Sequence, residues 1–177
     1  MKRLRWIDRV FKFDIPEGWM PDIIERLRGT TTRLKEITSY ISREQSIFRF
    51  NNKWSICEHI GHLADLDELH QGRIDDFINS SRHLRPADMS NAKTYEANHN
   101  DKSIDELIGR FEKGRTELVT RFESLDDDTQ VFQSLHPRLQ LPMKPVDMAF
   151  FTAEHDDHHL ADIRHILKQL NLQLHHT

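Results

Sequence analysis

Apolar residues recur at helical spacing along four long stretches of the chain. Those of the first stretch are Ile23, Ile24, Leu27, Leu34, Ile37 and Ile41. Steps of three or four residues place such side chains on one face of a helix, where they can pack against a core. Pro21 stands where the first turn of a helix tolerates proline. The pattern therefore predicts a first helix over residues 21–43.

The second apolar stretch begins with a helix-start signal. Ser55 and Glu58 have the spacing of a capping box, in which each side chain bonds the backbone N–H of the other residue. Asn52 is an alternative cap. The apolar positions that follow are Ile56, Ile60, Leu63, Leu66, Ile74 and Phe77. We predict a second helix over residues 54–80.

Two further stretches predict two more helices. The third helix is predicted over residues 104–123, with Ser103 as its cap. Asp105 and Glu106 lie in its first turn, where the helix dipole favours negative charge. The fourth helix is predicted over residues 146–170. No stretch shows the alternation of apolar and polar residues that marks a half-buried strand, so no strand is predicted.

Two of the connections between these helices are long. Pro86 and several asparagines keep residues 81–102 irregular, and three prolines do the same for residues 125–145. Helices of about 20 residues joined in this way predict an all-α fold, a four-helix bundle with long crossover connections. Residues 1–177 are expected to form a single domain, with residues 1–19 as an apolar arm packed on the bundle. The arm and the long connections could also bury surface between two subunits, so the sequence allows a homodimer.

Composition narrows the classes of partner. Of 177 residues, 37% are hydrophobic and 31% are charged, which suits a folded domain rather than a disordered chain. The formal net charge is -4 and no basic stripe stands out, which argues against a nucleic-acid partner. No apolar run reaches the roughly 20 residues that span a bilayer, so no membrane partner is expected. The single cysteine, Cys57, rules out an internal disulfide and fits a reducing cytoplasm.

The twelve histidines are the outlier in this composition, and the stretch AEHDDHHLADI, residues 153–163, holds three of them. A helix turns by about 100° per residue, so His159 lies about 40° from His155 on the fourth helix. The apolar residues of that helix share this direction, which turns both rings towards the core. Asp156 and Asp157 point elsewhere, towards an expected solvated face. A histidine pair at this spacing can chelate a divalent ion.

The second helix offers a third imidazole. His62 lies on the flank of its apolar arc, near the direction of Leu66 and Arg73. His59 lies on the opposite, polar flank and is expected to be solvated. His62 can therefore meet the histidine pair of the fourth helix across the bundle. Three imidazoles would leave one coordination position of a metal open for water or substrate, which is the pattern of a catalytic site.

The acidic residues near these histidines could have more than one role. Asp65 and Asp162 each follow a candidate ligand by three residues, so either carboxylate could accept the second ring N–H of a metal-binding histidine. Both could instead be ordinary solvated acids. A third alternative has no metal at all, with core histidines satisfied by Asp65, Asp162 or Glu154.

Arg73 is the remaining candidate for a functional side chain. It could face the pocket and bind a carboxylate of a small-molecule substrate, or form a surface ion pair with Asp76 or Glu96. The two long connections are expected to border the pocket, because function often rests on loops over a rigid scaffold. Cys57 points away from His62, so a buried structural role is favoured over a nucleophilic one.

Several sequence motifs of this chain together resemble those of the DinB-like superfamily, which includes the YfiT-type proteins. They are WSICEHIGHLAD, HDDHH followed by LADI, RLRGTTTRL, DMSNAKTYEANHN and LHPRLQLPMKPVDMAFF, and they cover nearly the whole chain in order. The resemblance implies a four-helix bundle with an unusual helix order. It also implies a divalent metal, often nickel or zinc, held by three histidines that correspond here to His62, His155 and His159.

The resemblance implies more than one activity. Some members are similar to thiol S-transferases, which join a low-molecular-weight thiol such as bacillithiol or mycothiol to an electrophile. One branch isomerises maleylpyruvate with a thiol cofactor, and others are described as metal-dependent hydrolases by analogy. Our first hypothesis is metal-assisted S-transfer from a small thiol. Metal-dependent hydrolysis, which would need no thiol, and a non-catalytic metal- or ligand-binding stress-response module are the alternatives.

Overall fold

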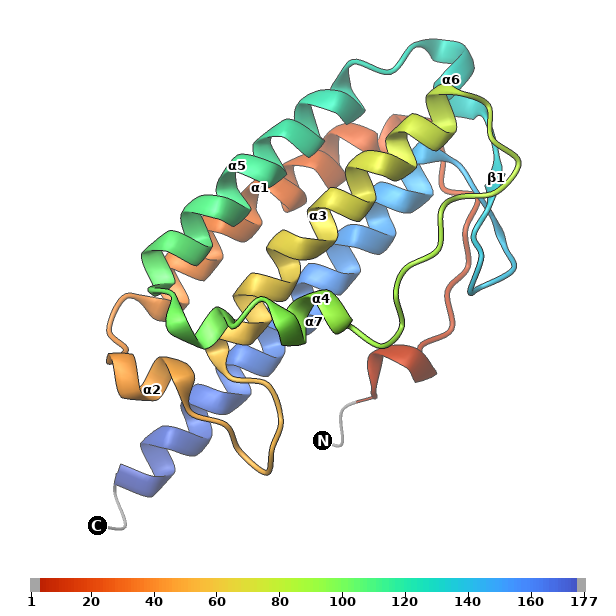
Figure 1. Ribbon diagram of the computed structural model, residues 1–177. Coiled ribbons are helices and arrows are strands. Elements are labelled where there is room, and N and C mark those ends of the chain that lie inside the picture. Colours follow the sequence, from red (N-terminus) through yellow and green to blue (C-terminus); the bar gives the residue numbers. More distant parts are fainter. Residues whose placement is uncertain (1–3, 175–177) are drawn as a thin grey trace.

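The computed structural model describes the backbone of residues 4–174 and the side chains of residues 4–170. Residues 1–3 of the predicted arm, and 175–177 of the predicted domain, lie outside the described residues. The long helices are α1 (Met20–Thr38), α3 (Ile56–Ile78), α5 (Ile104–Glu123) and α7 (Pro145–Leu174). They form a four-helix bundle (Figure 1), which confirms the predicted fold class. Within residues 4–174, no helix is both long and apolar enough to cross a membrane.

The order of the helices in the bundle differs from a simple up-and-down arrangement. The N-terminal halves of α1 and α7 share one core cluster with the C-terminal halves of α3 and α5. Thus α1 and α7 run one way, and α3 and α5 run the other. Since α3 and α5 are parallel neighbours, the segment 79–103 between them must travel back along the bundle (Figure 1). The segment 124–144 instead joins α5 to α7 at one end.

Capping residues fix where the helices begin. Ser55 and Glu58 form the predicted capping box of α3, and Ser103 forms another with Glu106 at the start of α5. The predicted first helix was too long, because α1 ends at Thr38. A further capping box at Ser42 then starts a short separate helix, α2 (Arg43–Ile47).

The two long connections contain short elements that periodicity does not predict. The crossover carries α4 (Ala92–Glu96) and a 3-10 turn, η3 (His99–Asp101), and both contact α3. The second connection carries α6 (Asp127–Val131). It also holds a small antiparallel hairpin of β1 (Ser134–Leu135) and β2 (Pro142–Met143). The prediction of no strand was therefore wrong here, because two-residue strands are too short to show alternation.

A buried polar layer divides the core into two apolar clusters. Each bundle helix contributes one residue to it, namely Thr30 from α1, Asp67 from α3, Arg115 from α5 and Asp156 from α7. Arg115 bridges the two acids, with Nη2 at 3.0 Å from an oxygen of Asp67 and 3.0 Å from one of Asp156. Thr30 donates a hydrogen bond of 2.8 Å to Asp156. One ionic network therefore ties all four helices together at mid-length.

The N-terminal arm packs along α7. It contains two 3-10 turns, η1 (Trp6–Asp8) and η2 (Glu17–Trp19). The Trp6 ring lies 5.0 Å from the ring of Phe151, and the Asp147 carboxylate accepts the backbone N–H groups of Asp14 and Ile15 at 3.0 and 2.9 Å. These contacts bring the Trp6 ring to 4.9 Å from that of His155, at the edge of the site described next.

Candidate metal centre

The three histidines singled out in the sequence meet between α3 and α7. The ring centroids of His155 and His159, one turn apart on α7, are 4.4 Å apart, and their Nε2 atoms are 3.1 Å apart. The ring of His62 on α3 lies 4.9 Å from that of His159 and 5.5 Å from that of His155. One ligand nitrogen from each ring falls within 4.8 Å of the other two. This spacing suits a single metal ion with three imidazole ligands.

A chain of hydrogen bonds holds the His62 ring in place. Its Nδ1 lies 3.0 Å from the hydroxyl of Thr94, and that hydroxyl in turn lies 3.4 Å from a carboxylate oxygen of Asp65. Asp65 is itself fixed by His99 at 2.8 Å and by Arg110 at 2.7 Å. If the Thr94 hydroxyl donates to Asp65, it must accept a hydrogen bond from Nδ1–H of His62. The lone pair on Nε2 of His62 is then left for a ligand. Asp65 thus reaches His62 through a threonine rather than directly.

His59 does not lie where the sequence places it. The prediction of a solvated ring was wrong, because His59 is buried and its Nδ1 lies 2.8 Å from Nδ1 of His159. His59 precedes His62 by three residues, so the two side chains lie about 60° apart on the helix, and both face α7. The Trp54 ring lies 5.6 Å from the His59 ring. His59 thereby occupies one nitrogen of His159 and leaves the other for a ligand.

Asp162 lies close to more than one histidine. Its carboxylate is 3.3 Å from Nε2 of His158. It also belongs to a second group, with His59 and His159, whose ligand atoms fall within 4.8 Å of one another. All three members of the His62 group line the pocket described below, whereas His59 and Asp162 do not. We therefore take the His62 group as the candidate centre.

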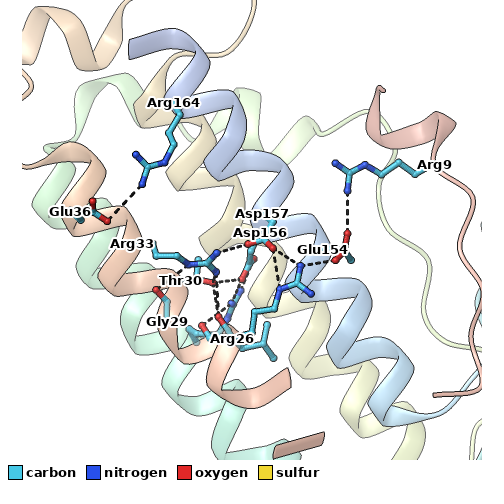
Figure 2. Close-up of polar contacts among 12 residues, drawn as sticks. Arg9, Arg26, Gly29, Thr30, Arg33, Glu36, Glu154, Asp156, Asp157 and Arg164 are labelled. Carbon is cyan, nitrogen blue, oxygen red and sulfur yellow. Dashed lines mark hydrogen bonds and ion pairs between the residues drawn. The ribbon is translucent and has the colours of Figure 1, made fainter. Parts of the chain in front are cut away.

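Three acids of the AEHDDHHLADI stretch turn to the other side of α7, where Glu154 and Asp157 meet arginines of α1 (Figure 2). Glu154 accepts a 2.6 Å hydrogen bond from Arg26, and Asp157 pairs with both Arg26 and Arg33. Asp156, which the sequence placed on a solvated face, is buried in the polar layer with Arg115. The face opposite the histidines is buried here because α7 contacts α1 as well as α3.

The environment keeps the three rings neutral in the metal-free protein. Burial lowers the pKa of His62 to about 3, and the neighbouring His59 adds to this effect. Burial, followed by the neighbouring histidines, holds the pKa values of His155 and His159 well below their ordinary value. Neutral imidazoles offer a lone pair at neutral pH, which is what metal ligation requires.

A pocket of about 550 Å³ lies over the three histidines. The helices α3 and α7 form one side of it, and the arm and Trp54 contribute another. Both long connections border it, as expected, through residues 86–89, 91 and 136–138. Its volume is in the range of small-molecule sites.

Arg73 lines this pocket and does not form the surface ion pair that the sequence allowed. It is 2% exposed, and its Nε donates a 3.1 Å hydrogen bond to the carbonyl of Arg85. Asp76 pairs instead with the Arg85 side chain. Cys57, also buried, lies outside the pocket, and burial raises the pKa of its thiol, which does not favour a nucleophile.

Several residues of the site escaped sequence reasoning. They are Trp54, His59, His70, Thr94, His136 and Arg138. His70 carried a usable signal, because it lies about 80° from His62 on the same helix. Thr94, His136 and Arg138 belong to the long connections, whose path no periodicity predicts.

Comparison with known proteins identifies the family of this chain. A family model of the DinB superfamily matches residues 23–163, so the chain belongs to that superfamily. No curated protein matches it.

Two solved structures share the fold. YfiT from Bacillus subtilis, described as a probable metal-dependent hydrolase with an unusual four-helix bundle topology, superposes with a TM-score of 0.76 at 16% identity, over 92% of this chain and 94% of that one. A mycothiol-dependent maleylpyruvate isomerase superposes with a TM-score of 0.67 at 12% identity, over 85% of this chain. The chain spans 61% of that isomerase. At these identities the likeness establishes the fold alone.

Replacing Thr94 with valine should weaken metal binding by about tenfold, because removing the partner of a ligand's second ring nitrogen typically costs 10–100-fold in affinity. The valine keeps the shape of the side chain but cannot bond Nδ1 of His62. The measurement is a competition titration of zinc against a chelating dye. Thr116→Val, which removes an exposed hydroxyl on α5, is the matched control. Equal affinity of Thr94→Val and the wild type would show that the threonine does not orient His62.

Proposed function

We propose that this protein binds one divalent metal ion through His62, His155 and His159 and uses it to transfer a low-molecular-weight thiol to an electrophile. The observation that carries the proposal is the convergence of three neutral imidazoles on one pocket. The description of one structural neighbour as a mycothiol-dependent enzyme supports the thiol, and that of the other as metal-dependent supports the ion.

The donor set fits a borderline-soft divalent ion such as nickel or zinc, since imidazole nitrogen suits both. The hydrogen bonds to Thr94 and His59 use Nδ1 of His62 and of His159. Nε2 of each of these two rings therefore remains for a metal. A divalent ion held there would keep a coordination position open and favour the thiolate form of a bound thiol.

The reaction in this proposal needs little further chemistry from the chain. The thiol gives up its proton, and its sulfur forms a bond to an electrophilic carbon of the second molecule. A leaving group then departs with the electrons of its broken bond, or, in an addition, the adduct takes up a proton. The protein positions the two reactants against each other. Apolar side chains such as Leu66, Leu69 and Phe151 line part of the pocket and exclude water there.

The test is a turnover assay with the nickel- or zinc-loaded protein, a panel of small thiols including bacillithiol and mycothiol, and a chromogenic aryl halide. We expect conjugation that requires both metal and thiol and that falls to background in His62→Ala and His155→Ala. His83→Ala, which removes an exposed histidine outside the site, should keep full activity. Conjugation that continues unchanged in the His62 and His155 variants would contradict the proposal.

Hydrolysis is the second candidate, favoured by the description of the Bacillus subtilis neighbour. It would use the same three ligands, with water in place of the thiol. Ester and amide panels without added thiol separate the two, because only a hydrolase turns over under those conditions. Tight metal binding with no turnover in either panel would indicate a non-catalytic binding module.

A further inference from the structure

The pocket contains a buried cation that forms no direct ion pair with a carboxylate of the described residues. Arg73 and Arg115 are equally buried, each 2% exposed. Arg115 forms ion pairs with both Asp67 and Asp156, whereas no ion pair to Arg73 occurs within residues 4–170. The one hydrogen bond of its guanidinium in that range runs from Nε to the carbonyl of Arg85, so the two terminal nitrogens remain available at the pocket wall.

Arg73 remains a cation under physiological conditions. Burial is the main cause that lowers its pKa, to about 10. The nearby Asp76 carboxylate opposes this shift, and the neighbouring Arg138 and Arg85 add to it. Taking an ion out of water is costly unless a counter-ion compensates it. A buried arginine without an ion pair on a pocket wall is therefore what we expect of a ligand-free site in which the ligand supplies the counter-ion.

Two residues of the second connection line the same pocket and could also bind an anion. Arg138 is one of them and is half-buried. His136 is buried, and its Nδ1 accepts the backbone N–H groups of Arg138 and Leu139 at 3.3 and 3.2 Å. Since Nδ1 accepts, Nε2 carries the ring hydrogen and is a donor. The hairpin thus adds a second cation and a neutral donor to the pocket that Arg73 lines.

We propose that Arg73, Arg138 and His136 form an anion subsite that holds a carboxylate of a small molecule bound beside the three histidines. A guanidinium fork matches the two oxygens of a carboxylate. The apolar wall formed by Leu66, Leu69 and Phe151 suits a carboxylate attached to an apolar body. This proposal rests on the proposed function in one respect: it assigns the carboxylate to one of the two reactants, the thiol or the electrophile.

The first experiment measures binding of phenylacetate to the metal-free protein by isothermal titration calorimetry at constant ionic strength, with the neutral phenylacetamide as comparison. We expect phenylacetate to bind at least tenfold more tightly than the amide. That preference should disappear in Arg73→Met, be reduced in Arg73→Lys, and stay intact in Arg28→Gln, which removes one exposed positive charge on α1. Equal binding of acid and amide to the wild type, or an unchanged preference in Arg73→Met, would overturn the proposal.

A second variant protects the test against misfolding. Arg138→Gln changes a half-buried side chain outside the helices, and it should also weaken phenylacetate binding. If circular dichroism shows that Arg73→Met is unfolded, the result with Arg138→Gln decides, and unchanged binding there overturns the proposal. No metal is present in these titrations, so failure of the metal site would leave their outcome untouched.

A third arm tells which reactant carries the carboxylate. Binding of 3-mercaptopropionate and of neutral 2-mercaptoethanol to the nickel-loaded protein is followed by the thiolate-to-nickel absorption band. If Arg73→Met weakens only the mercaptopropionate complex, the carboxylate belongs to the thiol. If both thiols bind as they do to the wild type while phenylacetate binding is lost, it belongs to the electrophile.

Discussion

Replacing Arg115 with methionine is expected to lower the free energy of unfolding by about 3–5 kcal/mol, because removing one partner of a buried ion pair leaves an uncompensated charge. Here two carboxylates, Asp67 and Asp156, would lose their shared cation in a layer where all three charged side chains are buried together with Thr30. Burial alone would raise the pKa of Asp67, and Arg115 holds it below its ordinary value instead. Urea denaturation followed by circular dichroism measures the change.

The matched control for this variant lies six residues further along α5. Arg121→Met removes the partner of Asp75, and both of those side chains are partly exposed, so the expected loss is below about 1 kcal/mol. A variant that removes all three charges, with methionine at 115 and asparagine at 67 and 156, should recover part of the stability lost in Arg115→Met. Similar small losses for Arg115→Met and Arg121→Met would show that the polar layer does not anchor the bundle.

The metal-free protein should lose stability steeply as the pH falls below 6.5. Burial lowers the pKa of His62 and of His136 to about 3, and those of His155 and His159 also lie well below the ordinary value of 6.5. Below pH 6.5 the unfolded chain therefore binds protons that the folded chain does not. Each such group lowers the free energy of unfolding by about 1.4 kcal/mol per pH unit, until the pH reaches its folded pKa.

Thermal unfolding between pH 7.5 and 4.5 measures this effect. The melting temperature should be nearly constant above pH 6.5 and then drop, before most carboxylates begin to titrate. Zinc added at pH 6 should raise it, because a ligand that binds only the folded state stabilises that state. Replacing the exposed His83 with glutamine should leave the profile unchanged. A flat profile from pH 7.5 to 5 would mean that the four rings are not held neutral by their surroundings.

Periodicity in the sequence was enough to predict the long helices and the direction of the key histidines. The third helix begins and ends at the predicted residues, and the capping boxes mark the starts of α3 and α5. His155 and His159 face inward because a helical wheel fixes the angle between side chains on one helix. These features depend on local spacing, which a single sequence contains.

Features that depend on which helices become neighbours could not be predicted in this way. Asp156 was placed on a solvated face, since nothing in its local sequence reveals that Arg115, 41 residues earlier, lies opposite it. His59 is a different case, because its spacing of three residues puts it about 60° from His62, so the helical wheel alone could have placed the two rings side by side. Thr94 and His136 reach the site on irregular connections, whose path follows from tertiary packing rather than from a repeat.

The most direct test of the central claim is the metal content of the protein, measured by inductively coupled plasma mass spectrometry after purification without a metal-affinity column. We predict about one divalent ion per chain in the wild type and in His83→Ala, and almost none in His62→Ala and His155→Ala. A wild-type protein that holds no metal, and still binds none after nickel or zinc is added, would contradict the account. The three histidines would then be core residues that satisfy one another.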